Sequence, residues 1–128
     1  MSLRGPLGQV LGRGSAKQGV HHWWLQRVTS VALVPLSIGF LVSLLALPAL
    51  DYATLVAWMR QGGVALGLVL LVLVAARHSQ LGVRVIIEDY VHASGVKALA
   101  LVIVDFAHVL AAAAAVFAIL KVALGGRL

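Results

Sequence analysis

Long uninterrupted runs of apolar residues dominate the chain, and the few charged residues divide it into segments. No charged residue occurs between Arg27 and Asp51, so Val28 to Leu50 supply 23 consecutive uncharged positions. A helix needs about 20 such residues to cross a hydrocarbon core of roughly 30 Å. The pattern therefore predicts a first transmembrane helix over about residues 25–48, which ends at Pro48.

The second apolar run is too short to cross a membrane. From Gln61 to Ala76 it contains 16 uncharged residues, which form only about 24 Å of helix at 1.5 Å per residue. We therefore expect the helix to continue through Arg77 and His78 and to cover about residues 62–87. This places an arginine and a histidine inside the bilayer, where such residues are costly and usually functional.

A third run lies between Lys97 and Lys121 and is interrupted only by Asp105 and His108. It predicts a third transmembrane helix over about residues 98–122. Residues 1–20 hold five glycines, three basic residues and no acid, which is typical of a short tail. The predicted fold class is all-α, with one integral membrane domain of three transmembrane helices.

Composition supports this assignment, and the basic residues predict its orientation. Hydrophobic residues make up 62% of the 128 positions and charged residues 11%, against roughly 45–50% and about 25% in soluble domains. A formal net charge of +6 would suggest nucleic acid binding in a soluble protein. Here the basic residues flank the apolar runs, and loops rich in them stay in the cytoplasm. The tail and second loop carry six of them and the opposite side three, so we expect a cytoplasmic N-terminus and a bacterial inner-membrane location: Arg4, Arg13, Lys17, Arg27, Arg84 and Lys97 against Arg60, Lys121 and Arg127.

The predicted second helix carries the residues with the clearest chemistry. His78 and Gly82 are four positions apart and share one face. A neutral imidazole with a small residue one turn away leaves room for a flat ring such as a haem. The chain contains no cysteine, so any metal centre must use histidine. Tyr90 follows His78 by 12 residues, about 18 Å along the helix, and reaches the membrane interface directly after Asp89.

These residues alone leave the chemistry open. His78 could equally be a buried histidine that is hydrogen-bonded between helices. An interfacial tyrosine such as Tyr90 is most often an anchor in the aromatic belt. A phenol stays protonated at neutral pH, however, and can also donate a hydrogen bond to a bound ligand.

Two motifs carry a resemblance to a known family. Residues 23–29, Trp-Trp-Leu-Gln-Arg-Val-Thr, open the first helix, and His78-x-x-x-Gly82 precedes Asp89-Tyr90 on the second. In a three-helix chain of this length, the combination resembles the hydrophobic membrane-anchor subunits of succinate dehydrogenase. The resemblance implies that His78 is an axial ligand of a b-type haem iron, with the other ligand in a companion cytochrome b subunit. It also implies that Tyr90 hydrogen-bonds quinone and that Asp89 shapes the charge and proton supply of that site.

The same resemblance implies a role within a larger complex. The chain would dock the flavoprotein and iron–sulfur subunits to the membrane and help to pass electrons from succinate to quinone. FAD and the iron–sulfur clusters would belong to those partners, because nothing in this sequence resembles a dinucleotide fold or a cluster ligand set. The chain would have no activity alone, and no catalytic residue is assigned to it.

Further charged residues at membrane depth keep other interpretations open. Arg27 can pair with a haem propionate or, more simply, with a lipid phosphate. The depth of Asp105 matches the range between Arg77 and Arg84, which predicts an interhelical contact, although Asp105 could instead orient His108 toward a metal. A proton-coupled transporter could use such residues, but the chain lacks the usual inverted repeats. A non-catalytic membrane assembly protein is the third class considered.

Overall fold

The structure, a computed structural model, describes residues 16–125 and consists of helices joined by short connections. Three helices are long and apolar enough to cross a membrane by length and composition, with spans at Val20–Leu45, Gly62–Tyr90 and Ser94–Ala123. This confirms the predicted all-helical membrane fold. The helices in chain order are α2 (Ala16–Leu45), α3 (Tyr52–Met59), α4 (Gly62–Tyr90) and α5 (Ser94–Ala123).

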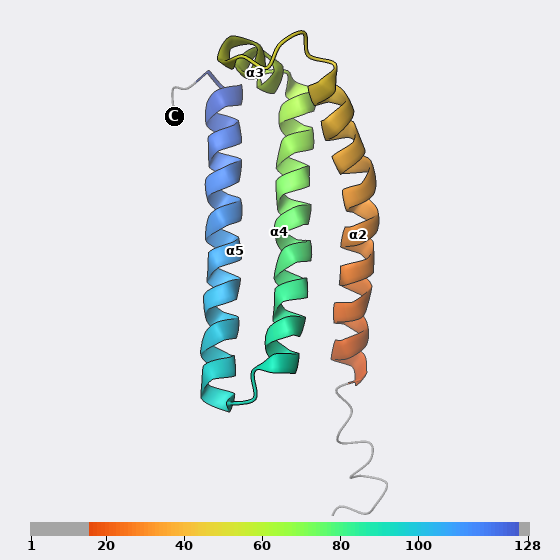
Figure 1. Ribbon diagram of the computed structural model, residues 1–128, viewed down its shortest axis with the longest axis vertical. Helices are drawn as coiled ribbons and strands as arrows, with labels where there is room; N and C mark the ends of the chain where they lie inside the picture. Colours follow the sequence, from red (N-terminus) through yellow and green to blue (C-terminus); the bar gives the residue numbers. More distant parts are fainter. Residues whose placement is uncertain (1–15, 126–128) are drawn as a thin grey trace, which may run out of the picture.

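The three long helices form a single layer with α4 in the middle, and they run alternately up, down and up (Figure 1). Helix α4 packs against α2 on one side and against α5 on the other, whereas α2 and α5 do not touch within the described residues. The short α3 lies across one end of the layer and contacts α4 and α5. Helices α2 and α5 therefore cover two sides of α4, and α3 contacts one end of it.

The long helices extend further than the apolar runs suggested. Helix α2 begins at Ala16, so part of the predicted tail is helical, while residues 1–15 lie outside the described residues. It ends at Leu45, shortly before Pro48, because proline disfavours helical conformation in the residue that precedes it. Helix α4 continues through Arg77 and His78 as predicted, and it ends at Tyr90.

Helix α3 is an element that the apolar pattern does not predict. Asp51 caps it: its carboxylate accepts hydrogen bonds from the Thr54 backbone N–H at 3.0 Å and from the Thr54 hydroxyl at 2.9 Å. These two hydrogen bonds, of which the one from the backbone N–H has the larger effect, hold the pKa of the Asp51 carboxyl below its ordinary value. The Asp-x-x-Thr sequence is a signal for a helix start, whereas the apolar pattern assigns Asp51 only to the end of the preceding run.

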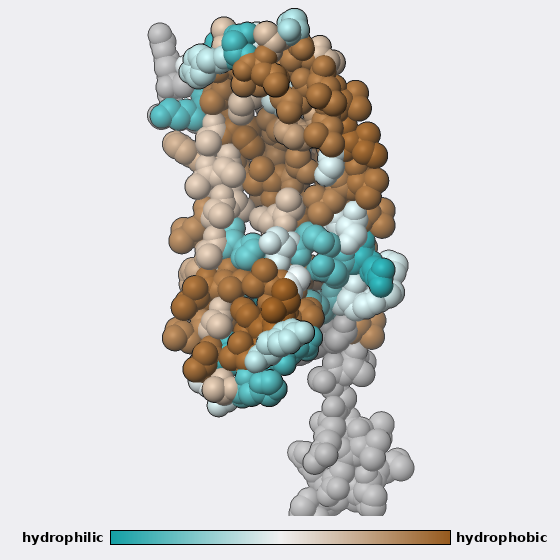
Figure 2. Space-filling model, in the orientation of Figure 1, coloured by the Kyte–Doolittle hydropathy of each residue, from teal (hydrophilic) through white to brown (hydrophobic). Residues whose placement is uncertain are grey.

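Little of the chain is buried by its own fold. The buried hydrophobic side chains among the described residues are Trp58, Ala65, Leu81 and Ile119, whereas large apolar residues are exposed along every long helix. In Figure 2, hydrophilic residues form a band across the lower half of the visible face, with hydrophobic surface above and below it. An apolar exterior is stable in lipid or against other membrane subunits, whereas polar side chains that face lipid are costly.

Candidate functional site

His78 lies at the contact between α4 and α2, and two residues of the predicted family motif face it. Its Nδ1 is 3.0 Å from the Thr29 hydroxyl, and its Nε2 is 3.4 Å from the Gln26 side-chain nitrogen. Both partners come from consecutive turns of α2. The contact fixes the ring between the two helices at mid-membrane depth.

The hydrogen bonds of Thr29 determine which ring nitrogen of His78 carries the proton. The Thr29 hydroxyl lies 2.8 Å from the Leu25 carbonyl oxygen and 3.1 Å from the Gln26 carbonyl oxygen. Its single hydrogen must point toward these acceptors, because two oxygens at that distance otherwise repel each other. The hydroxyl therefore accepts from the Nδ1–H of His78. The lone pair of this neutral imidazole is then on Nε2, the atom that is free to bind a metal.

The Gln26 side-chain amide faces His78 Nε2 from α2. The Gln26 amide meets Nε2 only at 3.4 Å, beyond the usual range of 2.7–3.2 Å for a good N–H donor. The Oε1 atom of Gln26 and the Nε2 atom of His22 are buried and have no hydrogen-bond partner among the described residues. A Cβ on Gly82 would come within 3.8 Å of the Gln26 nitrogen. The residues present therefore fit a neutral imidazole that could hold a metal through Nε2, with the Gln26 amide beside it.

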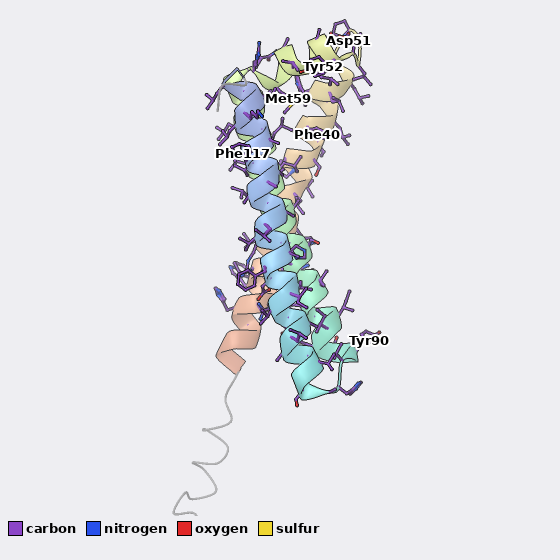
Figure 3. All side chains as sticks on the ribbon, turned by 90° about the vertical axis from the view of Figure 1, so that its left-hand side faces the viewer. Phe40, Asp51, Tyr52, Met59, Tyr90 and Phe117 are labelled. Atoms are coloured by element: carbon purple, nitrogen blue, oxygen red, sulfur yellow. The ribbon has the colours of Figure 1, made fainter. Side chains whose placement is uncertain are left out.

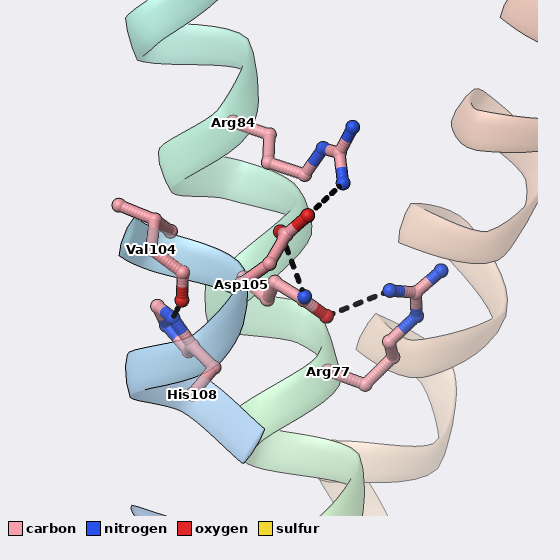
Figure 4. Close-up of polar contacts among 6 residues, drawn as sticks. Arg77, Arg84, Val104, Asp105 and His108 are labelled. Atoms are coloured by element: carbon pink, nitrogen blue, oxygen red, sulfur yellow. Dashed lines mark hydrogen bonds and ion pairs between the residues drawn. The ribbon is translucent and has the colours of Figure 1, made fainter. Parts of the chain in front are cut away.

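A second polar cluster joins α4 to α5. Arg84 donates to Asp105 at 2.7 Å in a salt bridge, and Gln80 donates to the other carboxylate oxygen of Asp105 at 2.9 Å (Figure 4). Arg77 donates to the Gln80 side-chain oxygen at 2.7 Å. The predicted contact between Asp105 and an arginine of α4 is confirmed, and Arg84 is the partner.

The alternative pairing of Asp105 with His108 is not formed. His108 Nδ1 is 2.8 Å from the Val104 carbonyl oxygen, which can only accept, so Nδ1 carries the proton. Its Nε2 is 3.2 Å from the Ser79 hydroxyl, which must donate to it. Among the residues described, no three His, Cys, Asp or Glu side chains gather closely enough to hold a metal ion. His108 is therefore an interhelical hydrogen-bonding residue in this geometry.

Tyr90 and Asp89 lie at the end of the molecule far from α3, whereas Arg27 follows Gln26 on α2 and lies at the level of His78. The Tyr90 side chain is 78% exposed at the last position of α4 and points outward (Figure 3). Asp89 is also exposed. The Arg27 guanidinium lies 5.3 Å from the ring centre of Trp23, in a cation–π contact on α2. Within the described chain, these residues do not converge with His78 into one pocket, which is consistent with a site completed by other subunits.

Comparison with known proteins decides between the remaining interpretations. A family model described as the succinate dehydrogenase/fumarate reductase transmembrane subunit matches residues 1–120. The chain belongs to this family. Proteins named succinate dehydrogenase hydrophobic membrane anchor subunit are similar to it. The one from Paracoccus denitrificans is 33% identical over 89% of this chain and 88% of its own length. The one from Rickettsia bellii is 29% identical over 91% and 94%. No solved structure matches the chain.

Family membership makes the chain a membrane-anchor subunit of the succinate dehydrogenase complex, an oxidoreductase. It disfavours the transporter and assembly-protein alternatives. The site contains two residues that sequence reasoning did not assign, Thr29 and Gln26. Both stand in the motif at residues 23–29, but that motif alone does not say which helix they face.

Proposed function

We propose that the anchor subunit holds one side of a b-type haem through His78 Nε2. The observation that carries this proposal is the hydrogen bond from Nδ1–H to Thr29, because it leaves Nε2 with the lone pair that an iron ligand requires. A haem bound here would supply a one-electron centre within the membrane. Since this chain offers a single suitable imidazole at that depth, the second axial ligand would come from the cytochrome b subunit.

We further propose that Tyr90 donates a hydrogen bond to a quinone carbonyl oxygen at the cytoplasmic interface. Its exposure at the end of α4 leaves the hydroxyl accessible to a ligand bound between subunits. A protonated phenol stabilises charge that develops on the oxygen during reduction. Asp89, the adjacent acid, contributes to the charge and proton supply of that site, and Arg27 is a weaker candidate contact for a haem propionate.

In this proposal the anchor docks the flavoprotein and iron–sulfur subunits to the bacterial inner membrane, with its N-terminus in the cytoplasm. FAD and the iron–sulfur clusters reside in those partners, and succinate oxidation takes place there. The three apolar spans provide the membrane attachment. The exposed acidic end of α4, at Glu88 and Asp89, is at the surface where the soluble subunits would sit.

The haem assignment is tested by His78→Ala in the intact complex, with His108→Ala as the matched control. Both are intramembrane histidines, but His78 Nε2 meets only a distant amide at 3.4 Å, whereas His108 Nε2 accepts from the Ser79 hydroxyl at 3.2 Å. We expect the reduced-minus-oxidised b-type absorbance to disappear or shift strongly in the first variant and to persist in the second. An assembled His78→Ala complex with an unchanged haem spectrum would contradict the assignment.

The quinone assignment is tested by Tyr90→Phe, with Tyr52→Phe as its control. Tyr52 is 84% exposed at the opposite end of the molecule (Figure 3). The loss of a hydrogen bond that strengthens during reduction costs about 1.4–3 kcal/mol, so quinone reductase activity should fall roughly ten- to hundredfold. Succinate oxidation with an artificial acceptor should hardly change. If both activities fall together the residue supports assembly, and if neither falls Tyr90 is only an interfacial anchor.

A further inference from the structure

Arg77 lies at the centre of a transmembrane helix and has no charged partner among the described residues. It follows Gly62 by 15 residues and precedes Tyr90 by 13, which places it about 20 Å along the axis from each end of α4. Its side chain is exposed, and its one hydrogen bond within the described chain goes to the neutral Gln80 oxygen. At this depth the guanidinium cannot reach either interface by snorkelling, which serves residues near helix ends.

No carboxylate of the described chain is available to pair with Arg77. The sequence has four acids, and Asp51 caps α3 at the far end. Glu88 and Asp89 follow Arg77 by at least 11 residues on α4, about 16 Å along the axis. Asp105 already accepts from Arg84 and Gln80. The α4–α5 cluster therefore carries two arginines against one aspartate, an excess of one positive charge at membrane depth.

We propose that the polar face formed by Arg77, Gln80, Arg84 and Asp105 is a docking surface for a transmembrane helix of a partner subunit, and that an Asp or Glu on that helix pairs with Arg77. Arginine has five donors in a planar fork and binds carboxylates in bidentate fashion. The ion pair would neutralise the excess positive charge and give acceptors to the remaining guanidinium N–H groups of Arg77. The Arg84–Asp105 salt bridge, with side chains 32% and 35% exposed, would border the contact. This inference rests on family membership and does not depend on the role of His78.

The contact can be trapped covalently through Arg77→Lys in the assembled complex. Dicyclohexylcarbodiimide enters the membrane and activates a carboxyl group, and the amine introduced at position 77 then displaces the urea to form an amide with that carboxyl group. We expect a cross-link between this chain and an acidic residue of another subunit, identified by mass spectrometry. Arg84→Lys is the positive control for reagent access. Because Arg84 pairs with Asp105, an amine introduced at position 84 should form an amide with Asp105 within the chain. The wild-type complex gives the background from native lysines.

Three results would overturn the proposal while the control reacts. A link from the amine at position 77 to a haem propionate would show that the carboxylate belongs to a cofactor. A link to Asp105 would show that the cluster neutralises itself by rearrangement. The absence of any link would show that Arg77 has no carboxylate neighbour.

A substitution gives an independent measure of the same contact. Arg77→Met leaves the partner's carboxylate buried and unpaired, which is strongly unfavourable. We expect the recovery of partner subunits with the tagged chain to fall at least about tenfold, whereas Arg60→Met, at an exposed position between α3 and α4, should leave recovery unchanged. Removal of an arginine eases insertion of the helix into lipid, so failed insertion would not explain a loss of partner subunits. Full recovery of the partner subunits with Arg77→Met would contradict the inference.

Discussion

Thr29→Val isolates the hydrogen bond that sets the tautomer of His78. Valine keeps the β-branched shape of threonine, so packing between α2 and α4 is preserved, but it cannot accept from Nδ1–H. The Leu25 and Gln26 carbonyls lose only an additional donor, since they already belong to the helix. If His78 holds the haem as proposed, the variant changes the electronic state of the imidazole and leaves Nε2 in place.

The expected changes in haem affinity and in midpoint potential follow from the loss of the hydrogen bond between His78 and Thr29. A metal-bound histidine whose second N–H loses its acceptor typically binds its metal about 10- to 100-fold more weakly. In a haem held by His78 as proposed, the hydrogen bond from Nδ1–H would increase electron donation to the iron and favour its oxidised form. A difference of about 0.5–1 kcal/mol between the two oxidation states corresponds to roughly 20–40 mV, because a tenfold change in equilibrium is about 59 mV for one electron. The midpoint potential should therefore rise by that amount.

Potentiometric titration of the haem absorbance in isolated membranes measures this shift, and the haem content of the purified complex measures affinity. Thr29→Ser keeps the hydroxyl and should retain both wild-type values. An equal shift in the serine variant would assign the effect to packing. If Thr29→Val changes neither quantity while His78→Ala removes the haem, the hydrogen bond has no part in tuning the ligand.

Two further predictions concern the helix contacts. Asp105→Asn keeps an acceptor for Gln80 but removes the charge opposite Arg84, so the stability of the complex in detergent should fall by about 0.6–1.7 kcal/mol, as measured by thermal unfolding; unchanged stability would mean that the salt bridge contributes little. Asp51→Ala should speed amide hydrogen exchange at residues 52–55 at neutral pH. Because the folded-state pKa of Asp51 is lowered, the cap stabilises α3 fully above the ordinary aspartate pKa of about 3.9 and loses that contribution as the pH falls through the lowered value. The cap is refuted if these exchange rates, after correction for their intrinsic pH dependence, respond neither to the Asp51→Ala substitution nor to the fall in pH.

The sequence was sufficient to place the membrane spans, because the chain has few charged residues and these mark where the apolar runs begin and end. The length of the second apolar run required α4 to continue through Arg77, and the structure confirms it. The partners of His78 were not predicted, although His22, Gln26 and Thr29 are spaced four and three residues apart and share the face of α2 that meets α4. The sequence alone does not say which helix that polar face meets. The α3 helix has only eight residues, so its one clear signal was the local cap at Asp51.

The layered arrangement explains why one helix carries both groups of polar residues. Successive residues of a helix point about 100° apart, so His78 faces α2 while Arg77 contacts the Gln80 that bridges to α5. Helices α2 and α5 do not contact each other, and the Arg77 side chain on α4 remains exposed. A central arginine facing lipid costs about 2.5–3.5 kcal/mol on translocon scales. That cost is removed only when another subunit covers this surface, so the residues that make α4 expensive to insert also favour its assembly into a complex.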